Sequence, residues 1–255
     1  MSSPFRQFPT SRGEKVYNAP VYTPFDWQEA IGHRAQFVES RIALGSPVAA
    51  ASFDFGILML TYRRQARKLF EVYDRLAMGA IGQQSDIEAL RIASVDFAHQ
   101  QGYTHSEQDV TLQRVLAAIS APVKRAFADF SMAPFVAQAV FAEVCERPED
   151  DRFAFLEYDG DFHVRGSFGF LAPTTEVGDK LEGRLRELKR GGVSENKAID
   201  ALDELWRSVA DQLRPESGSV LEEELMREIA VLERKPKGEV RFRHPEDEPR
   251  PCGPS

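Results

Sequence analysis

The alternation of strand-rich blocks with pairs of helices is the feature that most constrains the fold of this chain. Short apolar runs bounded by turn or charged residues fill residues 47–81 and 134–171, which indicates strands. Apolar residues at three- and four-residue spacing follow each block, which indicates amphipathic helices. Because a helix pair with one apolar face must cover a sheet, two such pairs and two strand blocks predict facing sheets between helices. We therefore expect an α+β chain folded as a four-layer αββα sandwich.

Turn and cap signals divide this pattern into individual elements. Thr23-Pro24 predicts the start of a first helix that ends at Gly45, and Asp159-Gly160 predicts a hairpin because its tight turn needs positive φ. The expected strands are 48–53, 57–62, 69–73, 76–81, 135–144, 153–158, 162–170, 228–232 and 239–243. The expected helix pairs are 87–97 with 112–127, broken at Gly102, and 177–188 with 199–213, separated by Gly191-Gly192.

Charge and hydropathy exclude several classes of function. The chain carries 32 Lys and Arg against 40 Asp and Glu, a net charge of -8, so nucleic acid is not expected as a partner. The most apolar stretch, 48–60, is interrupted by polar residues and is shorter than the roughly 20 residues of a membrane span. Because the first 23 residues lack an apolar signal region, we expect a cytoplasmic protein without membrane association.

The two ends of the chain differ in composition from its centre. Residues 1–23 mix Pro, Gly, Ser and scattered charge without a period, and we expect them to form a mobile arm. Residues 244–255 are rich in proline and charge, which is typical of a disordered tail. A single domain is therefore expected over 24–243.

Metal and cofactor sites are not expected. Cys145 and Cys252 are the only cysteines, and a disulfide or a multi-cysteine metal site is not predicted from them. The five histidines have no zinc-ligand spacing: His33, His99, His105, His163 and His244. Glycine-rich motifs for phosphate or dinucleotide binding are absent from the sequence, so we expect nucleotide binding to come from a partner.

Several short motifs follow one another along the chain: Gly45-Ser46-Pro47, the segment 64–74 (RQARKLFEVYD), and Ala80-Ile81-Gly82 followed by Asp86. Their order resembles that of the proteasome α-type subunit family, within the N-terminal nucleophile hydrolase superfamily. Segments 97–98, 102–103, 109–111, 174–176 and 228–232 are similar to the bacterial α subunits in particular. The resemblance extends over about residues 24–243, and the helix before Gly45 is the feature that distinguishes α from catalytic β chains.

The resemblance implies a non-catalytic subunit of a bacterial 20S proteasome core particle. Such a chain forms an outer homo-heptameric ring, stacks on proteasome β subunits, admits protein substrates and docks a ring-shaped AAA+ ATPase or another activator. Residues 1–23 would then form the gate, with Phe5, Phe8, Tyr17 and Tyr22 as candidates for an apolar plug. The alternative for this segment is a passive disordered tail.

Catalysis by the chain itself is the alternative reading of the resemblance. Ser46 lies at the position of the family's nucleophile, and Lys68 lies where catalytic chains keep a lysine that lowers the pKa of that nucleophile. The rest of that site is missing, because Tyr62 replaces the acidic residue that orients the lysine and Pro47 removes a backbone donor. Segment 172–174 replaces the family's Ser-Gly-Ser-like pattern, and segment 215–218 is only a weak match to its Asp-x-x-Ser-Gly pattern.

A docking pocket is the second use that the resemblance gives to Lys68. The matching lysine of α subunits receives the C-terminal carboxylate of an activator, and Gly45 and Gln83 fall at positions that line the same pocket. Gln83 departs from the leucine often found there in archaeal relatives. A solvated strand lysine beside Arg63, Arg64 and Arg67 is the alternative.

Overall fold

The computed structural model describes residues 24–166, 168–172, 193–213, 225–236, 238 and 240–245. The expected arm over 1–23, the expected helix over 177–188 and most of the expected tail lie outside these residues. Outside them also lie the candidate gate residues Phe5, Phe8, Tyr17 and Tyr22.

Within the described ranges, ten strands form two five-stranded antiparallel sheets, as the strand blocks predicted. The first sheet has the order β10-β9-β2-β1-β8: Phe242–Arg243, Met226–Glu233, Gly56–Arg63, Val48–Phe53 and Phe168–Leu171. The second has the order β3-β4-β5-β6-β7: Leu69–Tyr73, Leu76–Gly82, Ala137–Glu143, Arg152–Leu156 and Phe162–Gly166. Hydrophobic residues on both faces of most strands explain why these segments are continuous apolar runs rather than alternating ones.

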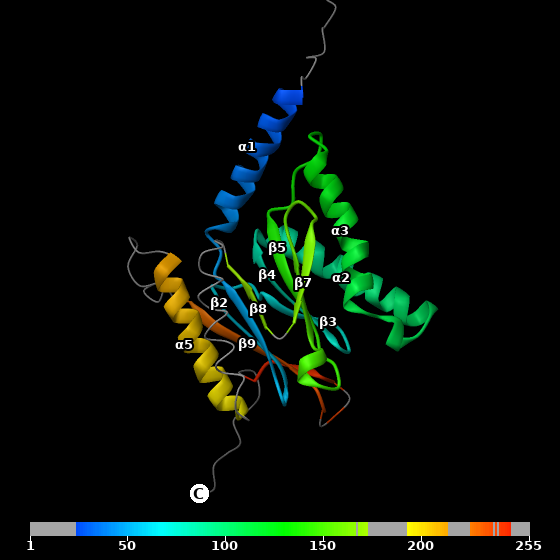
Figure 1. Cartoon of the computed structure of the whole chain (residues 1–255), viewed down its shortest axis with the longest axis vertical. Helices are drawn as coiled ribbons and strands as arrows, with labels where there is room; N and C mark the ends of the chain where they lie inside the picture. Colours follow the sequence, from blue (N-terminus) through cyan, green and yellow to red (C-terminus); the bar gives the residue numbers. More distant parts are fainter. Residues whose placement is uncertain are drawn as a thin grey trace, which may run out of the picture.

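Helices cover the outer faces of both sheets (Figure 1). The described helices are α1 (Pro24–Ile42), α2 (Gln84–Thr104), α3 (Leu112–Ala128) and α5 (Glu195–Leu213), with short 3-10 turns at Glu107–Asp109 and Pro148–Asp150. α2 and α3 pack on the second sheet, and α5 packs on the first. Among the described residues, no helix is long and apolar enough to cross a membrane.

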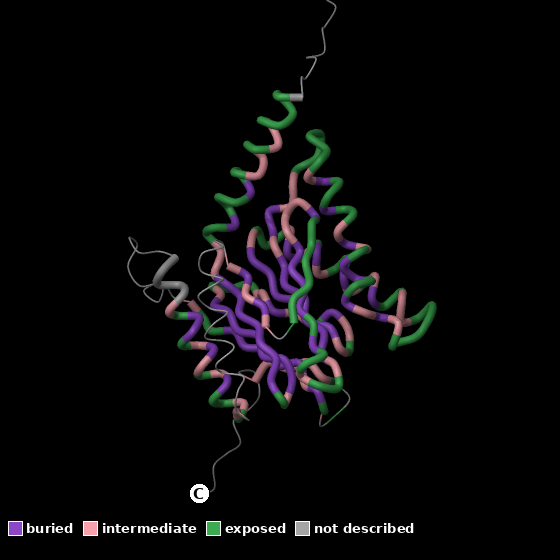
Figure 2. Tube along the Cα trace, in the orientation of Figure 1, coloured by how far each residue is buried: buried purple, intermediate pink, exposed green. Residues whose placement is uncertain are grey.

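Three separate hydrophobic cores define the four layers. The first lies between the sheets and includes Val48, Met59 and Val140. The second lies between the first sheet and α5 around Trp206, and the third lies between the second sheet and α2 and α3 around Phe141. Figure 2 shows these buried segments as a continuous band through the centre of the molecule. The four-layer αββα prediction is therefore confirmed.

The prediction of one continuous strand over 162–170 is wrong. The segment forms two strands in different sheets, because β7 pairs with β6 whereas β8 pairs with β1. The chain therefore passes from one sheet to the other between Gly166 and Phe168. The hairpin that precedes this crossing is confirmed: Gly160 has φ of +85°, in the left-handed region that glycine favours.

Two other boundaries differ from the sequence-based expectation. Gly102 does not separate helices, because α2 continues through it to Thr104. A Cβ at this position would lie 2.2 Å from the Tyr73 hydroxyl, so glycine permits close approach of α2 to β3 rather than a break. The last described strand is restricted to Phe242–Arg243, shorter than the expected 239–243.

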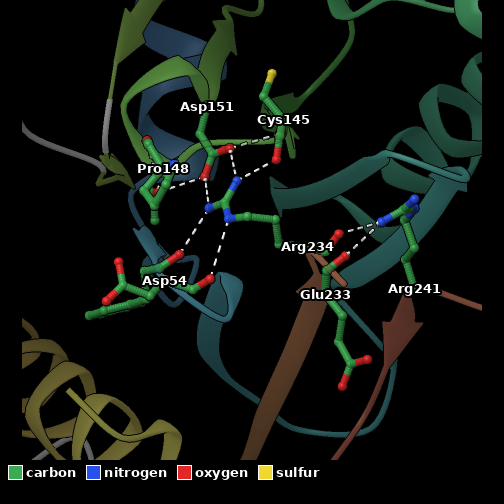
Figure 3. Close-up of polar contacts among 9 residues, drawn as sticks. Asp54, Cys145, Pro148, Asp151, Glu233, Arg234 and Arg241 are labelled. Atoms are coloured by element: carbon green, nitrogen blue, oxygen red, sulfur yellow. Dashed lines mark hydrogen bonds and ion pairs between the residues drawn. The ribbon is translucent and has the colours of Figure 1, made fainter. Parts of the chain in front are cut away.

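A buried ion pair joins the two sheets at the end of β1 that is remote from Ser46 (Figure 3). Arg234, which follows β9, donates to both carboxylate oxygens of Asp151 at 2.8 Å. Its other donors reach the carbonyl oxygens of Phe53 at 2.9 Å and Cys145. The Asp151 carboxylate also accepts hydrogen bonds from the Ser52 hydroxyl and the Cys145 amide. This network fixes the β1–β2 turn of the first sheet against the β5–β6 connection of the second.

A second arginine bridges the sheets along the β3 and β10 edges. The Arg241 Nε donates to the Asp74 carboxylate at 3.1 Å, and its Nη1 donates to the Arg234 carbonyl at 2.7 Å. A pocket of about 850 Å³ opens beside this contact, between β3, α2 and β10.

α1 leaves the sandwich at an angle and is anchored by polar contacts to two neighbouring segments (Figure 1). The Arg34 guanidinium donates to the carbonyl oxygens of Ala126 at 2.7 Å and Met132 at 2.5 Å, at the end of α3. The Tyr158 hydroxyl donates to the Glu39 carboxylate at 2.6 Å. These contacts hold α1 in one orientation relative to the body.

Candidate functional site

The candidate site begins at the turn that joins α1 to β1. The Gly45 amide donates to the Ile42 carbonyl at 2.8 Å and closes the last turn of the helix. A Cβ on Gly45 would lie 3.0 Å from that carbonyl oxygen and 3.3 Å from the Ile81 Cβ. Glycine therefore allows this turn to lie directly against the end of β4. Next in the chain, the Pro47 carbonyl accepts from both the Thr61 hydroxyl and the Trp206 indole at 2.7 Å.

Lys68 faces this turn from the start of β3. Its Nζ donates to the Ser46 carbonyl oxygen at 3.2 Å, and its own carbonyl accepts from the Ala80 amide of β4 at 3.1 Å. The side chain is half-buried. The contact joins residues 22 positions apart in the chain, and it directs the lysine toward the backbone of Ser46.

A buried carboxylate holds the main chain of Lys68. Glu228 of β9 is 3% exposed and accepts from the Lys68 amide at 3.0 Å and the Leu69 amide at 3.4 Å. The Arg63 Nε lies 3.6 Å from the same carboxylate. Burial raises the pKa of Glu228, and these amides and the Arg63 charge act in the opposite direction.

Gln83 lies next to the same turn, at the N-terminus of α2. Its amide donates to the Val136 carbonyl at 2.7 Å, and its carbonyl accepts from Ile87 at 3.0 Å. The side chain is exposed and its Nε2 donates to the Ser85 hydroxyl at 3.1 Å. Because Gly82 precedes it and the Gly82 amide is 3.6 Å from a Cβ built on Gly45, Gln83 borders the Gly45 turn.

Tyr62 belongs to a different layer of the fold. Its ring packs on Trp206 at a centroid distance of 4.3 Å, and its hydroxyl donates to the Asp203 carboxylate at 2.7 Å. The Arg207 guanidinium donates to the same hydroxyl at 2.8 Å. Burial, followed by the Asp203 hydrogen bond, raises the pKa of Tyr62. Tyr62 is therefore held between β2 and α5, whereas the Lys68 ammonium is held at the Ser46 carbonyl.

The structure thus brings Gly45, Ser46, Lys68 and Gln83 together at one end of the sandwich. The sequence reasoning missed Glu228, which it treated only as the first residue of an apolar strand. An acidic residue that opens an otherwise buried run was the available signal, because a buried carboxylate needs hydrogen-bond donors. Among the described residues, no cluster of three or more His, Cys, Asp or Glu side chains could hold a metal ion.

Three of the relatives found by comparison with known proteins carry the same description, proteasome subunit alpha. No protein-family model matches the chain. The chain is 31% identical to the proteasome subunit alpha of Thermomonospora curvata over 217 residues, which cover 84% of this chain and 89% of the relative. It is 33% identical to that of Xylanimonas cellulosilytica, with 68% of this chain and 70% of the relative covered. The corresponding subunit of Sanguibacter keddieii is 31% identical over 81% of this chain and 79% of its own length.

The two antiparallel sheets between helices, preceded by α1, define a proteasome-like sandwich with an N-terminal helix. At this level of identity and coverage, the chain belongs to the bacterial proteasome α-type subunit family.

Proposed function

We propose that this chain is a non-catalytic subunit that forms a homo-heptameric outer ring on proteasome β rings in the cytoplasm. In this role it gates substrate entry and docks a ring-shaped AAA+ ATPase or another activator, while the β subunits degrade the substrate. The domain 24–243 would build the ring and residues 1–23 would form the gate. The similarity to proteasome alpha subunits supports the α-type assignment, and the ring, gate and activator are the proposed extension.

The observation that carries the docking proposal is the position of Lys68. The Lys68 ammonium is held at 3.2 Å from the Ser46 carbonyl oxygen, near Gly45 and the exposed Gln83. It therefore provides a cation in a fixed position at the end of the sandwich where α1 meets β1. A C-terminal carboxylate is the anion that suits it, because charge-assisted hydrogen bonds are the stronger ones. Such a ligand would compete with the backbone carbonyl for the ammonium protons.

The exposed aromatic residues of α1 support assembly into a ring. Phe25 is 81% exposed, Phe37 50% and Trp27 46%, all on one helix that projects from the body (Figure 2). These side chains give the projecting helix exposed apolar area, and a ring requires two different complementary surfaces on each subunit. We assign α1 to one of these surfaces.

α1 also connects the docking site with the proposed gate. Its last residue is three positions before Gly45, and its first residue follows the segment 1–23. At 1.5 Å per residue, its 19 residues extend about 28 Å. A displacement of the Gly45 turn by a bound activator would therefore move the start of the arm.

The alternative is a self-processed peptidase that begins at Ser46. That reaction needs a free amine and an orienting acid near the lysine, as in other N-terminal nucleophile enzymes. The contacts of Tyr62 with Asp203 and Arg207 favour the non-catalytic role. Tyr62 replaces the orienting acid, and these contacts direct its hydroxyl to α5 and not to Lys68.

Reconstitution with a β chain from the same organism tests the proposal. Native mass spectrometry should give uncleaved chains in seven-membered rings that incorporate β, and a subunit that begins at Ser46 would establish the peptidase instead. We expect Lys68→Ala to abolish stimulation of degradation by the cognate ATPase without loss of assembly. Lys124→Ala is the matched control, because Lys124 is an exposed lysine of α3 paired with Asp161 at 3.3 Å. Unchanged stimulation of the Lys68→Ala particle would refute the docking role.

A further inference from the structure

We propose that Glu228 is a positioning residue for the docking site: its carboxylate fixes the main chain at Lys68, and so controls the strength of tail binding. This inference rests on the proposed docking role of Lys68. It assigns a function to a side chain that would not itself touch the activator.

The geometry places Lys68 between the two sheets. Its amide donates at 3.0 Å to a carboxylate of β9 in the first sheet, and its carbonyl accepts at 3.1 Å from Ala80 of β4 in the second. The Leu69 amide donates to the other oxygen of the same carboxylate at 3.4 Å. With both backbone groups engaged, the Cα of Lys68 is held against the Ser46 turn, and only side-chain torsions remain to be ordered on binding.

The charge of Glu228 is central to this arrangement. The residue is 3% exposed, and a carboxylate in that environment is stable only with nearby donors and cations. The groups that face it are the two amides at the start of β3, the Arg63 guanidinium of β2, and His244 beyond β10. The His244 Nδ1 contacts the Ile229 carbonyl at 2.8 Å, which assigns the proton to that nitrogen because a carbonyl only accepts.

Protonation would weaken this control. A neutral carboxyl group accepts hydrogen bonds less strongly than a carboxylate. One of its oxygens carries a proton, so that oxygen is a poorer acceptor for a backbone amide. Because burial raises the pKa of Glu228, protonation begins at a higher pH than for an exposed glutamate. Tail binding should therefore weaken in mildly acidic solution, above the pH at which the tail carboxylate itself is protonated.

The test compares Glu228→Gln with a matched buried glutamate. Glu143 is 5% exposed and its pKa is also raised by burial, but it lies at the opposite end of the β4–β5 ladder, opposite Leu76. The probe is a fluorescent octapeptide with the C-terminal sequence of the cognate ATPase, used as the free acid and as the amide, titrated against the assembled particle. We expect Glu228→Gln to weaken binding of the free acid about three- to tenfold, and Glu143→Gln to leave it unchanged.

The pH profile separates positioning from a merely structural role. As the pH is lowered from neutral, wild-type affinity should fall before the tail carboxylate is protonated, and the Glu228→Gln profile should lack this fall. His244→Asn removes the neighbouring imidazole and should retain the wild-type fall. If Glu228→Gln does not fold, the His244→Asn profile decides, because a flat profile in that variant overturns the proposal.

The outcomes distinguish this inference from the proposed function. If Lys68→Ala abolishes binding of the free acid while Glu228→Gln binds like wild type at every pH, the positioning role is refuted and the docking site stands. If Lys68→Ala binds like wild type, the docking function itself fails.

Discussion

Replacing Arg234 with methionine should be the most destabilising single change in the buried hydrogen-bond network that joins the two sheets around Asp151. Arg234 is the only cation that the described contacts place on Asp151, and both side chains are almost fully buried, at 5% and 0% exposure. Methionine keeps much of the aliphatic volume but donates no hydrogen bonds. The substitution leaves a buried carboxylate with only the Ser52 hydroxyl and the Cys145 amide as donors.

The expected loss follows from the unpaired charge. Removing one partner of a buried ion pair typically costs about 3–5 kcal/mol, and here the carbonyls of Phe53 and Cys145 also lose a donor, so we expect about 4 kcal/mol. Chains of this size shift by about 2–4 °C per kcal/mol, which predicts a Tm lower by about 8–16 °C. Replacing Asp151 with leucine in the same chain removes the stranded charge, so the double variant should be more stable than Arg234→Met alone.

Urea unfolding at fixed chain concentration measures both variants, since subunit association otherwise shifts the apparent stability. Arg147→Met is the control: Arg147 pairs with Asp150 at 2.8 Å but is 66% exposed, and we expect no measurable change. A loss below about 1 kcal/mol for Arg234→Met, or a double variant no more stable than the single one, would contradict the reasoning.

Two further predictions concern close contacts. Gly102→Ala should destabilise the chain by about 1–3 kcal/mol despite the better helix propensity of alanine, because the new Cβ would lie 2.2 Å from the Tyr73 hydroxyl and 2.9 Å from its Cζ. Tyr73→Phe removes the closer of these two contacts and should relieve part of this loss, and equal losses in both backgrounds would count against the steric explanation. Burial, then the hydrogen bond to Glu39, raises the pKa of Tyr158 well above its ordinary value of about 10. Formation of the Tyr158 phenolate, measured by absorbance, should therefore shift to lower pH in Glu39→Gln. The contribution of Tyr158 to the free energy of unfolding should be lost as the pH rises above about 10. An unchanged Tyr158 titration in Glu39→Gln would disprove that contribution.

The local pattern predicted most strands because apolar runs buried on both faces are visible without knowledge of their partners. Residues 48–53, 69–73 and 76–81 were placed to within one residue. The division between β7 and β8 was not predictable in this way, because an apolar run does not specify which strand it pairs with. Gly102 shows the converse problem, since a residue typical of a helix end instead permits contact with another element.

The candidate site was predictable only through the resemblance. Ser46 and Lys68 are 22 residues apart, and nothing in their spacing brings them together. The charged partners Glu228, Asp151 and Arg234 depend on contacts between the sheets, so their roles follow from tertiary pairing that periodicity does not contain.

The crossing between β7 and β8 makes the two long edges of the sandwich unequal. At that edge the sheets are connected covalently, through a single residue between Gly166 and Phe168. At the opposite edge, β3 and β10 are bridged by the side-chain contact of Arg241 with Asp74, beside the 850 Å³ pocket. On this side the sheets are also connected covalently, by residues 64–68 between β2 and β3, and the Lys68 and Leu69 amides donate to Glu228 of β9. The two connections therefore differ in length, one residue against five, and Lys68 belongs to the longer one.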